Sequence, residues 1–170
     1  MDVAKLKIIQ YPDPRLKKKS KPVVNFDPDL AALAQRMFEL MREEEGVGLA
    51  APQVGVNLRL FVMNHTGQPE DDRVVINPVL TALDGELENE EGCLSIPGVR
   101  VNVLRADQMK LEAVNLAGET FEREANDLES RVWQHETDHL DGILLIDRMS
   151  FTEKMRFRKK LKELEGKFKA

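Results

Sequence analysis

The pattern of apolar and polar residues divides the chain into predictable elements. After Asp27-Pro28, apolar residues recur three and four positions apart, the spacing that places side chains on one face of an α-helix. Asp27 is a typical helix N-cap, and a proline is well tolerated in the first helical turn. We therefore predict a helix that begins at Pro28 and contacts the core through Leu30, Leu33, Ala34, Met37, Phe38 and Met41.

Shorter apolar runs predict strands. Residues 58–63 and 74–76 form two such runs, and Asn77-Pro78 is expected to end the second run, because proline cannot donate a ladder hydrogen bond. A hairpin is predicted by an alternating run, a glycine turn and a second run, at residues 109–113, 117–118 and 120–123.

A second helix is predicted near the C-terminal third of the chain. Asn126 or Asp127 can cap this helix. One stripe of the helix carries two apolar residues and two histidines, so the histidines are expected to face inward. The four residues of this stripe are Leu128, Val132, His135 and His139.

Length and composition indicate one globular domain. With 170 residues, 42% of them hydrophobic, the chain is long enough to bury a substantial core, and no repeat or linker divides residues 1–170. The single cysteine, Cys93, excludes an internal disulfide and favours a reducing compartment. The N-terminus has no signal or transit pattern, and no run of about 18 apolar residues occurs. We therefore expect a cytoplasmic protein.

Charge is distributed unevenly along the chain. The formal net charge is −5, yet residues 151–170 carry eight Lys or Arg against three Glu, which leaves −10 for the remainder. This basic C-terminal helix is either a solvated surface or an electrostatic contact for RNA.

A metal site is predicted by three ligand-type residues. In His135-Glu136-Thr137-Asp138-His139 two histidines lie four apart on a helix, so both can reach one divalent ion. A catalytic zinc-type site has three protein ligands and keeps a position for water, and Cys93 is the best third ligand. The metzincin pattern fails because Leu145 occupies its final histidine position. A thermolysin-like site would need Glu163 or Glu165, which lie in the basic tail.

Two glycine-containing stretches precede the metal helix. Residues 91–98 surround Cys93 with glycines and a proline that permit tight turns and bring backbone amides close to a ligand. Residues 46–55 have small side chains and a single amide, Gln53. A nucleotide-binding loop is a poor alternative here, because no Lys-Ser/Thr pair follows and a complete G-x-G-x-x-G is missing.

Together the stretches GVGLAAPQVG, EGCLS and QHETDHLDG, in this order and at this spacing, resemble the three signature motifs of the peptide deformylase family. The resemblance extends to YPDPRL at residues 11–16 and to the helical tail, so it covers nearly the whole chain. It implies an α+β fold of mostly antiparallel β-sheets packed around a central metal-bearing helix, with an N-terminal and a C-terminal helix. The implied activity is removal of the formyl group from the N-terminal formylmethionine of nascent polypeptides, with release of formate.

A mechanism follows from this resemblance. A bound divalent ion lowers the pKa of its water, so that hydroxide is available to attack the formyl carbon near neutral pH. Glu136 is expected to act as general base and then as general acid. The family assigns stabilisation of the oxyanion to the Gln53 side-chain amide and the Leu94 backbone N–H. The expected metal ligands are Cys93, His135 and His139.

The family's substrate requires an apolar pocket for an unbranched methionine side chain. Positions that match this pocket are Val47, Leu128, Val132 and the aliphatic stem of Arg131, while ordinary core packing explains Leu128 and Val132 equally well. Gly48 can offer backbone groups to an extended peptide.

Cofactor and partners follow from the same comparison of motifs. The ligand set suits zinc, iron, cobalt or nickel, and the resemblance favours Fe(II) with zinc as a common occupant. Expected partners are the formylmethionyl peptide and, through the basic helix at 151–170, the ribosome. We expect no membrane or DNA partner, and a monomer.

Two other function classes remain open. A peptidase built on the same helix would require a third ligand other than Cys93. A non-catalytic binding module stabilised by metal would tolerate replacement of Glu136, although the presence of Gln53 and Leu94 argues against it.

Several neighbouring residues have structural alternatives. Asp138 either orients a ligand histidine or forms an ion pair with Arg100 or Arg105. Trp133 is expected to pack in the core rather than stack on substrate. His65, in a polar loop, is expected to be exposed to solvent.

Overall fold

The computed structural model describes residues 1–170 and has an α+β fold, as expected. Five strands form one antiparallel sheet in the order β1-β2-β3-β4-β5. No helix is both long enough and apolar enough to span a membrane. The elements are α1 (Pro28–Glu43), β1 (Gly48–Ala50), β2 (Leu60–Met63), β3 (Arg73–Cys93), β4 (Ile96–Val114), β5 (Thr120–Ala125), α2 (Asp127–Leu140), α3 (Phe151–Arg156) and α4 (Arg158–Lys169).

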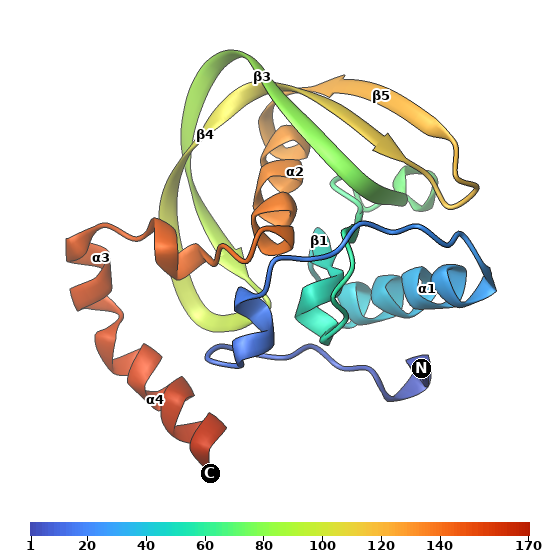
Figure 1. Ribbon diagram of the computed structural model, residues 1–170. Coiled ribbons are helices and arrows are strands. Elements are labelled where there is room, and N and C mark those ends of the chain that lie inside the picture. The colour runs from blue at the N-terminus through green and yellow to red at the C-terminus, as the bar shows by residue number, and fades with distance from the viewer.

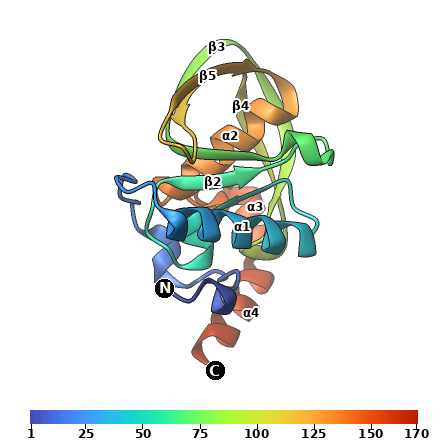
Figure 2. The same cartoon turned by 90° about the vertical axis from the view of Figure 1, so that its right-hand side faces the viewer.

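The sheet curves around α2. Strands β3 and β4 form a long hairpin that arches over this helix, and β5 continues the arch (Figure 1). Strands β1 and β2 lie between α2 and α1, so each of these helices covers one face of this part of the sheet (Figure 2). Because α2 is central, its side chains contact both the first strand of the sheet, β1, and the last, β5.

Helix α1 forms as the sequence predicts. The side chain of Asp27 accepts a hydrogen bond from the Leu30 N–H at 3.0 Å, and Pro28 occupies the first turn. All six apolar residues of the predicted stripe are buried, and they pack with residues of β1 and β2 in one hydrophobic cluster. The predicted hairpin is also confirmed, since β4 and β5 pair from Val114–Thr120 to Met109–Ala125.

The prediction that Asn77-Pro78 ends a strand is wrong. Strand β3 continues to Cys93, because the pairing with β4 shifts register between Ile76 and Val79. Proline is tolerated at such an irregularity, where it interrupts no regular ladder bond. Asn77 has a φ of 52°, and its side-chain amide exchanges two hydrogen bonds with the backbone of Val23.

Around α2 the sequence interpretation needs two corrections. Asn126 is the N-cap residue but makes no side-chain cap bond, and the Asp127 N–H donates instead to Asp107 at 2.9 Å. His65 is partly buried rather than exposed, with Nε2 3.1 Å from a carboxylate oxygen of Glu129. Trp133 is completely buried, as expected for a core residue.

The basic tail consists of two short helices rather than one, with a break at Phe157 between α3 and α4. It is anchored to the body at several points: Leu164 is buried, the Tyr11 hydroxyl donates to Glu165, and Glu153 accepts a hydrogen bond from the Asn102 N–H. The tail therefore packs against the end of the β3–β4 hairpin while its charged face remains exposed.

One glycine of the connection after α2 yields a stability prediction. Gly142 has a φ of 73°, and a β-carbon there would overlap the backbone carbonyl oxygen of Lys17. We expect Gly142→Ala to lower the free energy of unfolding by about 1–3 kcal/mol or more, as measured by urea denaturation. Gly166→Ala is the control, because no atom lies near Gly166 and alanine favours a helix. Equal stability of both variants would contradict this account.

Candidate metal centre and active site

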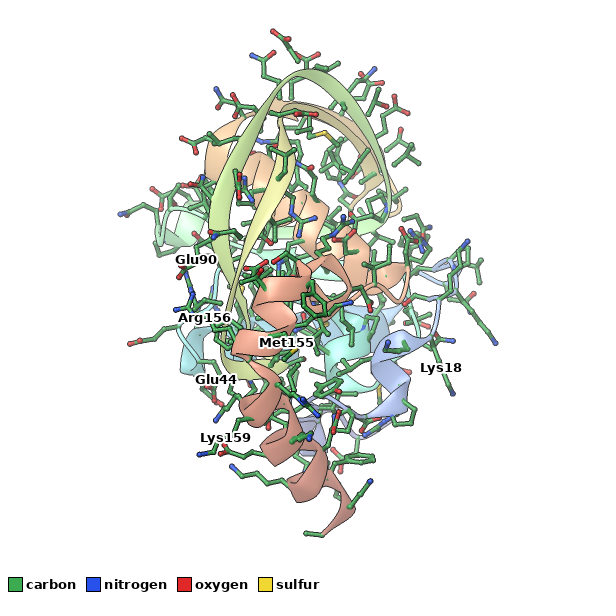
Figure 3. All side chains as sticks on the ribbon, turned by 90° about the vertical axis from the view of Figure 1, so that its left-hand side faces the viewer. Lys18, Glu44, Glu90, Met155, Arg156 and Lys159 are labelled. Carbon is green, nitrogen blue, oxygen red and sulfur yellow. The ribbon has the colours of Figure 1, made fainter.

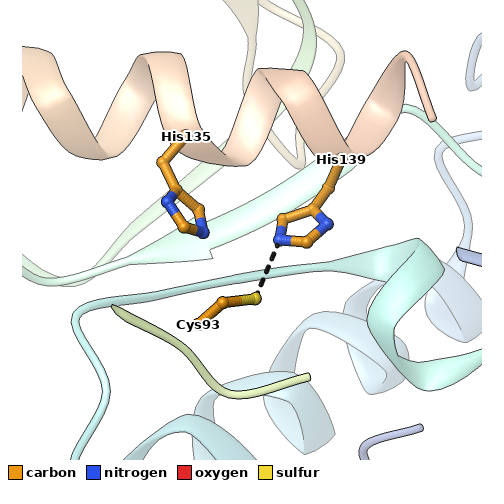
Figure 4. A group of neighbouring side chains, drawn as sticks. All are labelled: Cys93, His135 and His139. Atoms are coloured by element: carbon orange, nitrogen blue, oxygen red, sulfur yellow. Dashed lines mark hydrogen bonds between the residues drawn. The ribbon is translucent and has the colours of Figure 1, made fainter. Parts of the chain in front are cut away.

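Three side chains converge between the end of β3 and helix α2. Cys93 is the last residue of β3, before a two-residue turn into β4, while His135 and His139 lie one turn apart on α2. Cys93 Sγ is 3.4 Å from His139 Nε2, and the ligand atoms of all three residues lie within 4.8 Å of one another (Figure 4). The structure thus brings together the three predicted ligands.

The protonation preferences of the two histidines differ. Burial, together with the positive charges of His135 and Arg105, lowers the pKa of His139 well below its ordinary value, so this ring is neutral. Burial also acts to lower the pKa of His135, but hydrogen bonds with Cys93 and Glu91 outweigh it and raise that pKa. A divalent ion would displace the proton of His135, as metal binding to imidazole generally does. Two imidazoles and one thiolate fit a zinc-type or iron-type ion.

A buried carboxylate supports His135 from behind. Glu91 Oε1 is 2.9 Å from His135 Nδ1, which leaves Nε2 of the ring directed toward the ligand cluster. Arg105 donates to both oxygens of Glu91 at 2.8 Å, and Arg131 donates to Oε2 at 2.5 Å. Burial alone would raise the pKa of Glu91, but the bonds from Arg105 and His135 hold it far below its ordinary value. Such partners fix the tautomer and plane of a metal-binding histidine.

The sequence analysis did not assign this role to Glu91. A signal was present, because residues two apart on a strand point to the same face, and Glu91 precedes Cys93 by two positions on β3. The two arginines could not be assigned from sequence, because Arg105 lies on β4 and Arg131 on α2.

A cavity of about 480 Å³ opens beside the ligand cluster. The segment before β1, the adjoining ends of β3 and β4, and one face of α2 line it. Val47 and Leu128 are each nearly half exposed and stand at its mouth, whereas Val132 is buried. All five predicted substrate-binding residues line this cavity: Val47, Gly48, Leu128, Arg131 and Val132.

Arg131 makes contacts beyond its predicted role in lining the methionine pocket. Besides Glu91, its guanidinium donates to the backbone carbonyls of Val103 on β4 and Leu87 on β3. Its stem lines the cavity while its charged end ties α2 to both strands of the hairpin. Arg131 therefore combines a position in the cavity wall with a link between three elements of the fold.

Gly48 allows the first strand to approach α2 closely. A β-carbon at this position would lie 3.0 Å from Cγ and Cδ of Glu136 and 3.0 Å from a methyl group of Val132. A side chain at residue 48 would press on both Glu136 and Val132, so glycine lets the backbone of β1 lie this close to the site without moving either residue.

Glu136 is a buried carboxyl group without a hydrogen-bond partner for Oε2. Its Oε1 lies 4.0 Å from His135 Nε2, on the side of the ligand cluster. Burial raises the pKa of Glu136 to about 7, even though the charge of His135 acts in the opposite direction. A carboxyl group with a pKa near the working pH can both accept and return a proton.

Gln53 presents an amide donor beside Cys93. The side-chain oxygen accepts a hydrogen bond from the Ala50 N–H at 2.9 Å, which fixes the direction of the amide group. Its Nε2 then lies 3.1 Å from the Ser95 hydroxyl and 3.6 Å from Cys93 Sγ. Leu94 lies in the adjoining turn and lines the cavity, and its N–H has no acceptor in a loop, turn or side chain. Two donors thus border the ligand cluster.

The model of the polypeptide deformylase family matches residues 5–155. The chain belongs to this family. Peptide deformylase of Neisseria meningitidis serogroup B is 47% identical over 161 residues, which are 95% of this chain and 96% of that relative. The chloroplastic peptide deformylase 1B of rice is 43% identical over 166 residues, 96% of this chain, but the chain spans only 62% of the rice protein's length.

Solved deformylase structures have the same fold. The Plasmodium falciparum peptide deformylase superimposes with a TM-score of 0.92 at 38% identity, covering 96% of this chain and 97% of the other. The Legionella pneumophila peptide deformylase gives 0.89 at 42% identity, with 94% and 95% covered. As a deformylase-family member, the chain is an enzyme of the metal-dependent hydrolase type.

Residues outside this deformylase site settle two alternatives. Glu165 accepts a hydrogen bond from Tyr11, and the ligand-type cluster includes neither Glu163 nor Glu165, so a thermolysin-like third ligand has no support. Asp138 pairs with Arg105 and not with Arg100, whose guanidinium pairs with Glu90.

The Glu91 network generates a prediction about stability. Glu91→Gln leaves the buried guanidinium of Arg131 without a charged partner and removes one of the two carboxylate partners of Arg105. We expect the free energy of unfolding to fall by about 3–5 kcal/mol in chemical denaturation. Glu90→Gln is the matched control, because the neighbouring Glu90–Arg100 pair is more than half exposed and should contribute less than about 1 kcal/mol. Similar losses in both variants would show that burial of the Glu91 carboxylate is unimportant.

Proposed function

We propose that the chain carries out the family's reaction, hydrolysis of the formyl group from N-formylmethionyl peptides, with Cys93, His135 and His139 as metal ligands and Glu136 as general base and acid. One observation carries this proposal: a buried carboxyl group with a pKa raised to about 7 lies beside a three-ligand cluster in the wall of a peptide-sized cavity. A purely structural metal site does not require a buried carboxyl group with a raised pKa beside its ligands.

The proposed cofactor is one divalent ion, with Fe(II) the native metal and zinc, nickel or cobalt as substitutes. When bound, the ion supplies an acidified water and polarises the formyl carbonyl. The ligand set of two imidazoles and one thiolate supports iron as well as zinc, and the choice of iron rests on the resemblance to the family. The free thiol of Cys93 and the formylated substrate support a location in a reducing compartment where synthesis starts with formylmethionine, the cytoplasm.

Proton transfer is the proposed task of Glu136. As the nucleophilic water adds to the formyl carbon, Glu136 accepts its proton, and it returns a proton to the departing amine nitrogen when the C–N bond breaks. The products are formate and a free N-terminal amine. The partnerless Oε2 supports this role, because a buried carboxylate oxygen in a purely structural role is normally hydrogen-bonded.

Stabilisation of the developing oxyanion is proposed for the Gln53 amide and the Leu94 N–H. The hydrogen bond from the Ala50 N–H fixes the orientation of the Gln53 amide, so its Nε2 stays directed toward the ligand cluster. A fixed donor of this kind typically lowers the barrier by about 3–4 kcal/mol.

Substrate recognition is proposed to combine strand addition with an apolar pocket. Strand β1 pairs with β2 along one edge only, so its other edge, near Gly48, is open to an extended peptide. The methionine side chain is proposed to enter the cavity between Val47, Leu128, Val132 and the stem of Arg131. Because all of these residues belong to one chain, a monomer suffices for activity.

The first experiment compares formate release from formyl-Met-Ala-Ser by iron-loaded protein, purified without oxygen, with release by Glu136→Gln. We expect the variant to lose at least about 100-fold in kcat with equal metal content, the typical contribution of a positioned general base.

In the parent protein the rate of formate release should fall as the pH drops and Glu136 becomes protonated. The acid limb should lie below about 7, because a cation held beside Glu136 would lower this pKa. Formate release by both proteins at equal rates would refute the assignment of Glu136.

We also propose that the basic tail contacts ribosomal RNA. A shallow groove on the outer face of α3 and α4 is lined by Met155, Arg156, Arg158, Lys159, Lys162 and Glu163. The four cations of this groove have no acidic partner within salt-bridge distance, and Figure 3 shows Arg156 and Lys159 on this exposed surface. Unpaired cations on an anchored helix suit a phosphate backbone.

The tail proposal predicts a salt-dependent association. Replacing Arg156, Lys159 and Lys162 together by glutamine should weaken co-sedimentation with ribosomes and reduce the slope of log affinity against log salt by about 0.7–0.9 for each lost phosphate contact. The matched control replaces Lys18, Lys19 and Lys21, which are also exposed and unpaired but lie in the N-terminal segment. Equal loss in both triple variants would indicate a non-specific charge effect.

A further inference from the structure

The network around Glu91 continues from the metal centre to the protein surface. Arg105, whose side chain is only 4% exposed, uses its remaining terminal nitrogen to donate to Asp138 Oδ2 at 2.8 Å. Asp138 also accepts from Arg148, at 2.6 Å on Oδ2 and 2.7 Å on Oδ1. Charges of alternating sign therefore connect Arg148, Asp138, Arg105 and Glu91, and the series ends at His135 Nδ1.

We propose that Arg148 is a positioning residue that acts through Asp138 and Arg105 on the orientation of His135. The inference rests on the proposed metal centre and adds to it a residue that touches neither substrate nor metal. Arg148 closes a short 3₁₀ helix at Leu145–Arg148, between α2 and the basic tail.

The geometry of Arg105 explains how this influence is transmitted. Its planar guanidinium forms hydrogen bonds with two carboxylates, Glu91 and Asp138. Because the guanidinium is rigid, a shift of either carboxylate tilts the plane of the whole group. Arg148 holds Asp138 at both oxygens, which prevents rotation of that carboxylate. Without Arg148, Oδ1 of Asp138 loses its only side-chain donor. The Asp138 carboxylate can then rotate, and the Arg105 guanidinium that bonds both Asp138 and Glu91 is held less firmly.

A purely structural role for Arg148 is the alternative, because its side chain is 37% exposed and exposed pairs contribute little to stability. The chain offers a matched control in Arg59. It donates to the Leu140 carbonyl at 3.1 Å and to Asp141 at 3.0 Å, so it ties the same end of α2 without any link to Glu91.

The test measures metal retention by zinc-loaded protein, without substrate. We compare the rate of Zn²⁺ release to excess chromophoric chelator for the parent, Arg148→Gln, Arg148→Lys and Arg59→Gln, and record the visible spectra of the cobalt-loaded proteins. Arg148→Gln should release zinc about threefold to tenfold faster, below the 10–100-fold typical of direct partners of a ligand. It should also alter the cobalt spectrum, while Arg148→Lys should lie between Arg148→Gln and the parent.

Arg59→Gln should retain zinc as well as the parent protein does. The proposal is overturned if Arg148→Gln releases zinc at the parental rate while its thermal midpoint falls, or if Arg59→Gln releases zinc as fast as Arg148→Gln. Since no substrate is present, failure of the deformylase assignment would leave this result interpretable.

Discussion

The Glu91 carboxylate is the point on which the site depends. It is almost completely buried, and it receives hydrogen bonds from side chains of β4 and α2 while it lies on β3. An uncompensated charge at such depth would oppose folding, so the three elements can pack only in the arrangement that supplies all of its donors. That same arrangement places Cys93, two residues further along β3, opposite the two histidines of α2. The folding requirement and the metal geometry are thus satisfied by one set of contacts.

The two histidine ligands and the candidate acid–base residue could be predicted because their spacing is local, whereas Cys93 could be predicted because it is the only cysteine and lies in a motif that resembles the family's. His135 and His139 follow helical periodicity, and Glu136 lies between them on the same element. Of the charge network, only the Asp138–Arg105 pair was among the sequence alternatives. The contacts of Arg105 and Arg131 with Glu91, and of Arg148 with Asp138, could not be predicted in this way, since they join elements whose pairing is decided by the whole fold. Sequence alone offers no rule for which of several arginines meets a given carboxylate.

The fold predictions failed for a related reason. Asn77-Pro78 has the local features of a strand end, but the long pairing of β3 with β4 overrides them and absorbs the proline at a register shift. The sequence around His65 is typical of an exposed loop, yet the His65 ring is partly buried because it pairs with Glu129 at the start of α2. For helix α1, by contrast, the start and the buried stripe were predictable, because its cap and its apolar residues are both local and agree with each other.

The proposed docking of substrate along the open edge of β1 has a consequence for when the enzyme can act. A strand edge reads the backbone of its partner and is indifferent to most side chains, so proteins of very different sequence can present the same formylated end. The backbone must, however, be extended and free of other hydrogen bonds for several residues. A chain whose first residues have already entered a helix or a sheet cannot dock there. Under this proposal, deformylation has to be completed before the first residues of the new protein fold.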